Sequence, residues 1–257
     1  GTFLPNPNSY VNGNHLKYFE FAGRIFARAI VEQINLEPHL ALALRKKLLK
    51  YDLTIDDIEE FDPQLFESLK WILENDLSAN PDFELYFTAD TDNIGKHEVY
   101  ELIENGAKTL VTNENKHLFV QKTIEYRTDV AIQDQSCAFC TGFFSIIPSE
   151  KIGIFTPEEL DRIICGESFI DVDDWQKNCF FTGQFSINHP TIVIFFNVIK
   201  SWDQKDIAKL LYFITGSSQV PLGGFATYKE MGRPITIGSV DDKDKLITAH
   251  TCSNLLV

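Results

Sequence analysis

Apolar side chains recur at helical spacing along much of this chain. The first such stretch begins at His15, and its small and apolar positions share one helix face: Leu16, Phe19, Gly23, Phe26, Ala27 and Ile30. The small side chains of Gly23 and Ala27 favour close packing against another helix. A second helix is predicted over 40–49 and ends near Tyr51.

Three further helices carry clear start or stop signals. Asp62-Pro63 opens the first, because aspartate caps the free N–H groups of a first turn and proline suits the first helical position. Thr156-Pro157 opens the second, which ends at Cys165-Gly166. Asp203 caps the third, and Gly216 ends it. Local chemistry therefore predicts these helices independently of their packing.

Weaker patterns complete the expected secondary structure. Apolar stripes predict helices over 113–124 and 192–199. Short apolar runs predict strands at 83–87, 109–111 and 234–238. Residues 221–225 are expected to form a turn, and residues 239–245 an acidic loop.

The composition supports one large domain or two ordinary ones. The chain has 257 residues, of which 44% are hydrophobic and 21 are Phe. No stretch approaches the ~18 uninterrupted apolar residues of a membrane span. The N-terminus lacks the basic start and apolar run of a signal peptide. We therefore expect a soluble protein of the cytoplasm or the nucleus, with no membrane span.

Charge and cysteine usage narrow the function classes. A net charge of −14 argues against nucleic acid as a partner, because phosphate binding needs concentrated Lys and Arg. The five cysteines form no disulfide-framework pattern, so we expect reduced thiols. Cys137 and Cys140 match C-x-x-C, but no second pair follows at zinc spacing, and both are predicted to be core thiols on a helix face. We expect no metal and no cofactor.

One cysteine lies in an unusual sequence setting. The segment 248–254 places Cys252 among small and polar residues, with His250 two positions before it. Cysteine usually prefers an apolar, buried site. These residues alone leave two interpretations equal: a reactive thiol, or a half-buried cysteine at the end of a strand. If the backbone is extended here, His250 and Cys252 share a face.

Nine segments, taken in order, resemble the HECT-type ubiquitin ligase catalytic domain. They are residues 15–24, 68–76, 111–116, 142–148, 158–166, 171–175, 213–218, 220–225 and 248–252. The last reads Thr248-Ala249-His250-Thr251-Cys252. Together they span almost the whole chain, which makes the resemblance specific.

The resemblance implies an α+β fold with two lobes. Residues 1–165 would form a mostly helical N-lobe, entered partway through the family pattern, in which about 60–128 form a small β-containing subdomain. Gly166, Glu167 and Ser168 would be a short hinge. Residues 169–257 would form an α/β C-lobe that stops before the family's C-terminal tail.

The resemblance also implies a reaction. A ubiquitin-conjugating enzyme would deliver ubiquitin as a thioester, Cys252 would accept it, and a lysine of a protein substrate would then take it. Exchange between a thiol and a thioester is nearly isoenergetic, so the site needs a thiolate and alignment more than a powerful base. His250 is expected to support the thiolate or orient the site, and Thr251 to give polar support. Packing of His250 to hold the loop is an equal alternative.

Docking of the conjugating enzyme would use the helix after Asp62 and the helix after Asn115. Transfer of the family pattern gives six positions: Leu65, Ser68, Leu69, Ile72, Phe119 and Thr123. Apolar helix stripes mostly face cores, so burial of Leu65, Leu69 and Ile72 in the core is the competing interpretation. Tyr18 matches the neighbourhood of a second, non-covalent ubiquitin site in some family members.

Two other function classes stay open. Ser253 stands where the family usually has Phe, and Ile247 where it usually has Pro, which would suit a catalytically impaired module that binds ubiquitin or the conjugating enzyme. A cysteine hydrolase built on Cys252 would need a histidine base and an orienting Asn or Asp from other elements. The sequence singles out no such pair, and it does not identify the protein substrate.

Overall fold

The computed structural model describes residues 2–79, 84–93, 96–240 and 246–257. Helices and short strands are mixed along the chain, so the expected α+β content is confirmed. The chain divides into two compact units, residues 1–28 with 40–157 and residues 29–39 with 158–257, each with a hydrophobic core. Among the described residues, no helix combines the length and apolar character that a membrane crossing requires.

The elements up to residue 152 are mostly helical. The helices are α1 (His15–Glu32), α2 (Leu42–Leu49), α3 (Asp56–Glu59), α4 (Pro63–Glu74), α5 (Lys116–Thr128), α6 (Gln133–Phe144) and α7 (Ser149–Ile152). The strands are β1 (Thr2–Phe3), β2 (His39–Leu40), β3 (Thr88–Asn93) and β4 (Lys96–Glu101). Single 3-10 turns cover Pro7–Val11, Leu77–Ala79, Gly106–Lys108 and Val130–Ile132.

The remaining elements mix helix and sheet. The helices are α8 (Pro157–Cys165), α9 (Val172–Asn178), α10 (Pro190–Lys200), α11 (Gln204–Thr215) and α12 (Phe225–Glu230). The strands are β5 (Phe180–Thr182), β6 (Thr236–Gly238), β7 (Ala249–His250) and β8 (Leu255–Leu256), with a 3-10 turn over Thr251–Ser253.

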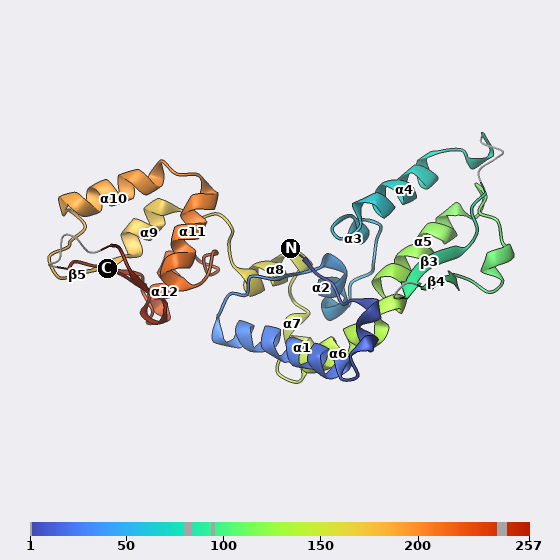
Figure 1. Ribbon diagram of the computed structural model, residues 1–257, viewed down its shortest axis with the longest axis horizontal. Helices are drawn as coiled ribbons and strands as arrows, with labels where there is room; N and C mark the ends of the chain where they lie inside the picture. Colours follow the sequence, from blue (N-terminus) through green and yellow to red (C-terminus); the bar gives the residue numbers. More distant parts are fainter. Residues whose placement is uncertain (1, 80–83, 94–95, 241–245) are drawn as a thin grey trace. The chain divides into compact units, whose positions relative to one another are not determined.

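Helices α1 and α6 cross at two glycines, as Figure 1 shows for the two ribbons. A Cβ atom built on Gly23 would lie 2.0 Å from the carbonyl oxygen of Phe139, and one built on Gly142 would lie 1.8 Å from that of Glu20. Only glycine permits backbones this close. The predicted close packing of Gly23 against another helix is confirmed, whereas Leu16, predicted on the same face, is exposed.

The predicted helix starts and stops are confirmed in detail. The Asp62 carboxylate accepts a hydrogen bond from the backbone N–H of Leu65 at 3.1 Å, and α4 begins at Pro63. Asp203 caps α11 in the same way through the N–H of Asp206 at 2.8 Å. Gly216 ends α11 with a φ of +79°, in the left-handed region that favours glycine. The helix ending at Cys165 is present as α8.

The strands predicted at 83–87 and 109–111 pair with each other, but only as one antiparallel bridge. Residue 83 lies outside the described residues. Tyr86 bridges Leu110, and the N–H of Val111 donates a hydrogen bond of 2.7 Å to the carbonyl oxygen of Leu85. The longer pairing is the antiparallel hairpin of β3 and β4, in which Thr88 faces Glu101. The sequence did not predict this hairpin, because its strands are largely polar and show no apolar alternation.

The C-terminal sheet has the strand order β5-β6-β8-β7. Its first two pairings are parallel, and β7 pairs with β8 antiparallel. Figure 1 shows α9, α10, α11 and α12 grouped with this sheet, and Trp175 stacks on Phe225 in their core at 5.1 Å between ring centroids. The predicted strand at 234–238 is confirmed as β6. The predicted turn ends at Gly224, because Phe225 is already the first residue of α12, a helix that the sequence did not predict. Within the predicted acidic loop, residues 241–245 lie outside the described residues.

The C-x-x-C pair lies on α6, as predicted, but only one of its thiols is largely enclosed. Cys137 is exposed, which corrects its assignment to the core, while Cys140 is half-buried. Burial raises the pKa of Cys140 to about 11. The two cysteines therefore differ in reactivity although they are one helical turn apart.

Candidate active site

Cys252 lies at the tip of a β-hairpin formed by β7 and β8. Ala249 faces Leu256 in the pairing, and the backbones of Thr248 and Val257 exchange two hydrogen bonds of 2.9 Å at the open end. The four residues from 251 to 254 turn the chain, the first three as a 3-10 turn. This geometry holds the Cys252 side chain in an exposed position. An accessible thiol held between two strands can react with a group carried by a large partner protein.

Asn254 closes this turn and is itself buried. Its φ is +49°, a left-handed conformation that asparagine tolerates better than most residues. The side-chain amide donates a hydrogen bond of 2.7 Å to the carbonyl oxygen of Arg233, and the Asn254 carbonyl accepts one of 2.9 Å from the N–H of Thr236. The turn that carries Cys252 is thereby fixed to β6 and to the residues before it.

A pocket of about 250 Å³ adjoins the cysteine. It is lined by Gln33, Ile34, Asn35, Thr215, Gly216, Ser217, Pro221, Tyr228, Met231, Arg233, Thr251, Cys252 and Asn254. Burial raises the pKa of Tyr228 to about 12, and its hydrogen bond with Thr215 opposes this shift. Tyr228 therefore keeps its proton at neutral pH and offers no base to the thiol.

The shared face predicted for His250 and Cys252 is absent. That expectation required an extended backbone, but Thr251–Ser253 is a helical turn. His250 is exposed, and its backbone carbonyl accepts a hydrogen bond of 3.3 Å from the Ser253 hydroxyl. Thr251 lines the 250 Å³ pocket beside Cys252, whereas His250 is not among the described residues that line it.

A family model described as HECT-domain (ubiquitin-transferase) matches residues 1–257. The chain belongs to the HECT family. It is 40% identical over 258 residues to the E3 ubiquitin-protein ligase TOM1-like of Neurospora crassa. The matched region covers 99% of this chain and 6% of that relative. Identity to the E3 ubiquitin-protein ligase TOM1 of Saccharomyces cerevisiae is 36%, over 99% of the chain and 8% of the relative.

A third relative has a different overall length. The E3 ubiquitin-protein ligase NEDD4 of Rattus norvegicus is 36% identical over 99% of this chain and 29% of its own length. The chain thus spans less than a third of each of these three relatives.

The HECT docking positions transferred to α4 and α5 divide by burial. Leu69, Ile72 and Phe119 are buried in the core that also holds Phe87 and Ala89, and Leu69 is only 1% exposed. Thr123 is a buried polar residue. The Phe119 ring packs edge-on against Phe87 at 5.5 Å between centroids. Leu65 is half-buried and Ser68 is exposed. Only Leu65 and Ser68 of this set therefore offer substantial surface.

A pocket of about 690 Å³ runs along α4 beside these positions. Its lining residues are Glu67, Ser68, Lys70, Trp71, Ile72, Glu74 and Leu85; we call this the α4 groove. Trp71 is 40% exposed, which is unusual for so large an apolar ring. Trp71 was not among the predicted docking positions, although its spacing of three from Ser68 places both on one helix face.

The proposed hinge segment begins with a constrained glycine. Gly166 has a φ of +89°, and a Cβ atom there would lie 2.3 Å from the carbonyl oxygen of Val220. Glu167 forms an antiparallel bridge with Val220, with hydrogen bonds of 2.7 and 3.1 Å, while Ser168 is exposed. Any movement in this segment that changed the register of Val220 would break two backbone hydrogen bonds.

Tyr18 lies on the exposed face of α1 together with Phe21 and Ile25.

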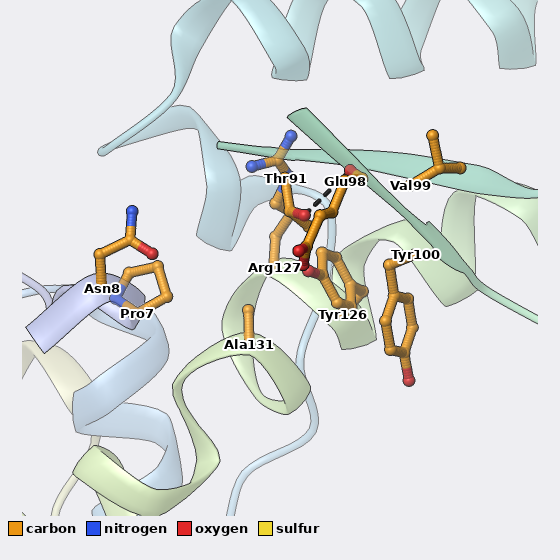
Figure 2. Close-up of a pocket in the computed structure, with 9 residues that line it drawn as sticks. All are labelled: Pro7, Asn8, Thr91, Glu98, Val99, Tyr100, Tyr126, Arg127 and Ala131. Atoms are coloured by element: carbon orange, nitrogen blue, oxygen red, sulfur yellow. Dashed lines mark hydrogen bonds between the residues drawn. The ribbon is translucent and has the colours of Figure 1, made fainter. Parts of the chain in front are cut away.

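A separate pocket of about 430 Å³ is lined by Pro7, Asn8, Thr91, Glu98, Val99, Tyr100, Tyr126, Arg127 and Ala131 (Figure 2). The Tyr100 and Tyr126 rings stack there at 4.3 Å, and burial raises the pKa of Tyr126. None of the site residues predicted from the sequence lines this pocket.

Proposed function

We propose that this chain is the catalytic part of a ubiquitin-protein ligase that carries ubiquitin on Cys252. The observation that supports this most is the exposed Cys252 thiol at a hairpin tip, inside a sequence that matches the HECT family from end to end. The relatives' own names describe E3 ubiquitin-protein ligases. A thiol that must meet a protein-sized thioester needs this kind of accessibility.

Two acyl transfers make up the reaction. The Cys252 thiolate attacks the carbonyl carbon of the ubiquitin thioester, and the sulfur of the conjugating enzyme leaves as a thiolate, which then takes up a proton. A neutral lysine amine of the protein substrate then attacks the new thioester, Cys252 leaves as thiolate, and the amine loses a proton as the amide forms. Thiolate nucleophilicity and alignment suffice for the first step. Thr251 and the anchored Asn254 align the Cys252 thiolate with the thioester. His250, near the tip, acts as a supporting residue.

The α4 groove is the proposed docking surface for the conjugating enzyme. Trp71 and Ser68 give it an exposed aromatic ring and a small polar residue, and Leu85 adds an apolar wall. Aromatic side chains in such grooves commonly carry much of the binding free energy. In this proposal Leu69, Ile72 and Phe119 act from beneath, as the packed support that shapes the groove, and Thr123 supports them from α5.

The remaining parts of the proposal concern arrangement and partners. Residues 1–165 and 169–257 act as two lobes, with Gly166, Glu167 and Ser168 as the hinge between them. Tyr18, with the exposed apolar residues beside it, is the proposed non-covalent ubiquitin contact. Selection of the protein substrate falls to regions outside this chain, since the relatives are several times longer.

A single-turnover reaction distinguishes this function from its alternatives. The chain is mixed with conjugating enzyme carrying ubiquitin as a thioester, together with a lysine-bearing acceptor protein. A ligase forms a ubiquitin–acceptor amide that withstands reducing agent. A cysteine hydrolase releases free ubiquitin without needing the acceptor, and a binding module leaves the charged conjugating enzyme unconsumed. Either of these two outcomes contradicts the proposal.

A further inference from the structure

A second cysteine lies in a cluster that the ligase reaction does not use. Asp161 and Cys165 are one turn apart on α8 and so share a face, and His39 approaches them from β2. The Asp161 carboxylate lies 2.9 Å from Nδ1 of His39, and its other oxygen lies 3.9 Å from Sγ of Cys165. One ligand atom from each of the three residues lies within 4.8 Å of the other two.

The backbone keeps this cluster together. The N–H of Leu36 donates a hydrogen bond of 2.9 Å to the carbonyl oxygen of Ile164, which ties the segment before His39 to the end of α8. The Cys165 thiol is fully buried, whereas the His39 and Asp161 side chains remain 37% and 21% exposed. The His39 and Asp161 side chains therefore lie at the surface above the buried sulfur of Cys165. One side of the cluster stays open to solvent.

These three side chains are the ligand types that zinc prefers. A tetrahedral zinc ion at ordinary bond lengths sets its ligand atoms roughly 3.3–3.6 Å apart. The ligand atoms of this cluster lie from 2.9 Å to at most 4.8 Å apart, so side-chain adjustments of about 1 Å would complete the geometry. A thiolate ligand favours zinc over calcium or magnesium. Water would fill the fourth position on the open side.

Gln219 contacts the far side of the His39 ring. Its side-chain Nε2 lies 3.3 Å from Nε2 of His39. The two ends of an amide are interchangeable in assignment, and with the amide turned over Oε1 would accept a hydrogen bond from the Nε2–H of His39. In that tautomer Nδ1 of His39 carries no proton and faces the Asp161 carboxylate, so a cation bound by both groups would remove their repulsion.

We propose that His39, Asp161 and Cys165 form a zinc-binding site, with Gln219 holding the imidazole in the ligating tautomer. Such an outer hydrogen bond to a ligating histidine is a general feature of protein zinc sites. The metal ties β2 to the last residue of α8, directly before Gly166. Binding replaces the Cys165 thiol proton, so zinc affinity increases with pH.

Metal titration of the chain tests the site. The two exposed thiols are first removed by Cys137→Ser and Cys252→Ala, so that they cannot bind the metal. We expect one Zn²⁺ per chain, a higher melting temperature with zinc, and a thiolate-to-cobalt charge-transfer band when Co²⁺ is used instead. Cys165→Ser, His39→Gln and Asp161→Asn should each weaken zinc binding at least ~10-fold.

Cys179→Ser is the matched control, because Cys179 is another buried thiol in the same compact unit but lies outside the cluster. It should keep both the zinc affinity and the cobalt band. His39→Gln and Asp161→Asn alter half-exposed side chains and keep their size, so they test the site without emptying the core. Absence of stoichiometric binding, or an unchanged affinity in Cys165→Ser, would overturn the proposal.

Discussion

Asn254 lies two residues after the proposed nucleophile, Cys252. Its side-chain amide donates a hydrogen bond of 2.7 Å to the backbone carbonyl of Arg233. This bond connects the turn that carries Cys252 to the segment leading into β6. Because Asn254 is also in the left-handed region, one residue supplies both the turn's conformation and its anchor.

Substitutions at Asn254 separate these two contributions. Asn254→Gly keeps the backbone conformation and removes the anchor, and should lower stability by about 1 kcal/mol. Asn254→Ala also meets the left-handed penalty and should cost roughly 1–2 kcal/mol more. Thermal unfolding measures both effects, and both variants should load ubiquitin more slowly than the parent chain. Equal stability of the two variants would show that the φ of +49° is not under constraint.

The α4 groove can be tested at its surface without disturbing the core beneath. Ser68→Arg places a large charged side chain beside Trp71 and should reduce loading from the conjugating enzyme about 10-fold, equivalent to ~1.4 kcal/mol of binding. Gln121→Arg is the matched control, since Gln121 is exposed on α5 but lines a different pocket. Leu69→Ala and Phe119→Ala are poor tests, because both residues are buried and their loss would also destabilise the fold. Loading that Ser68→Arg leaves unchanged would place docking elsewhere.

The crossing of α1 and α6 should tolerate no side chain at its glycines. Gly142→Ala would bring a Cβ atom to 1.8 Å from the Glu20 carbonyl oxygen, so the helices must separate. We expect a loss of about 1–3 kcal/mol or more in the free energy of unfolding. Gly13→Ala is the control, because no heavy atom lies within 4 Å of the added Cβ. Similar stability of the two variants in denaturant titrations would contradict this packing.

The five thiols should differ widely in their alkylation rates. Cys137 and Cys252 are exposed, whereas burial raises the pKa of Cys140 to about 11 and that of Cys179 to about 12. The thiolate is the reactive form, and its fraction at pH 8 falls about 10-fold for each unit by which the pKa rises. Mass spectrometry after brief treatment with iodoacetamide should find the first two modified and Cys179 unmodified. Rapid native-state modification of Cys179 would refute its burial.

Local sequence signals predicted those helices whose ends are set by single residues. The Asp62 cap, the Pro63 start and the Gly216 stop depend on the backbone of one turn, so they can be read without tertiary structure. The family fold followed from ordered motifs, of which the segment ending at Cys252 is one. In both cases the information lies in residues that are close together in the chain.

Features that depend on distant partners could not be read this way. The β3–β4 hairpin is largely polar, and the helical turn at Thr251–Ser253 depends on the pairing of β7 with β8 and on the anchor at Arg233. Burial of Leu69 and Phe119 depends on Phe87 and its neighbours closing over them. An apolar helical stripe indicates that a face is covered, but not by what.

Ubiquitin loading, compared at the two exposed cysteines, shows whether Cys252 is the acceptor. The parent chain, Cys137→Ser and Cys252→Ala are each mixed with charged conjugating enzyme and separated with and without reducing agent. We predict a ubiquitin adduct that reducing agent removes, present in the parent and in Cys137→Ser and absent from Cys252→Ala. An adduct of equal yield on Cys252→Ala, or none on the parent chain, would contradict it.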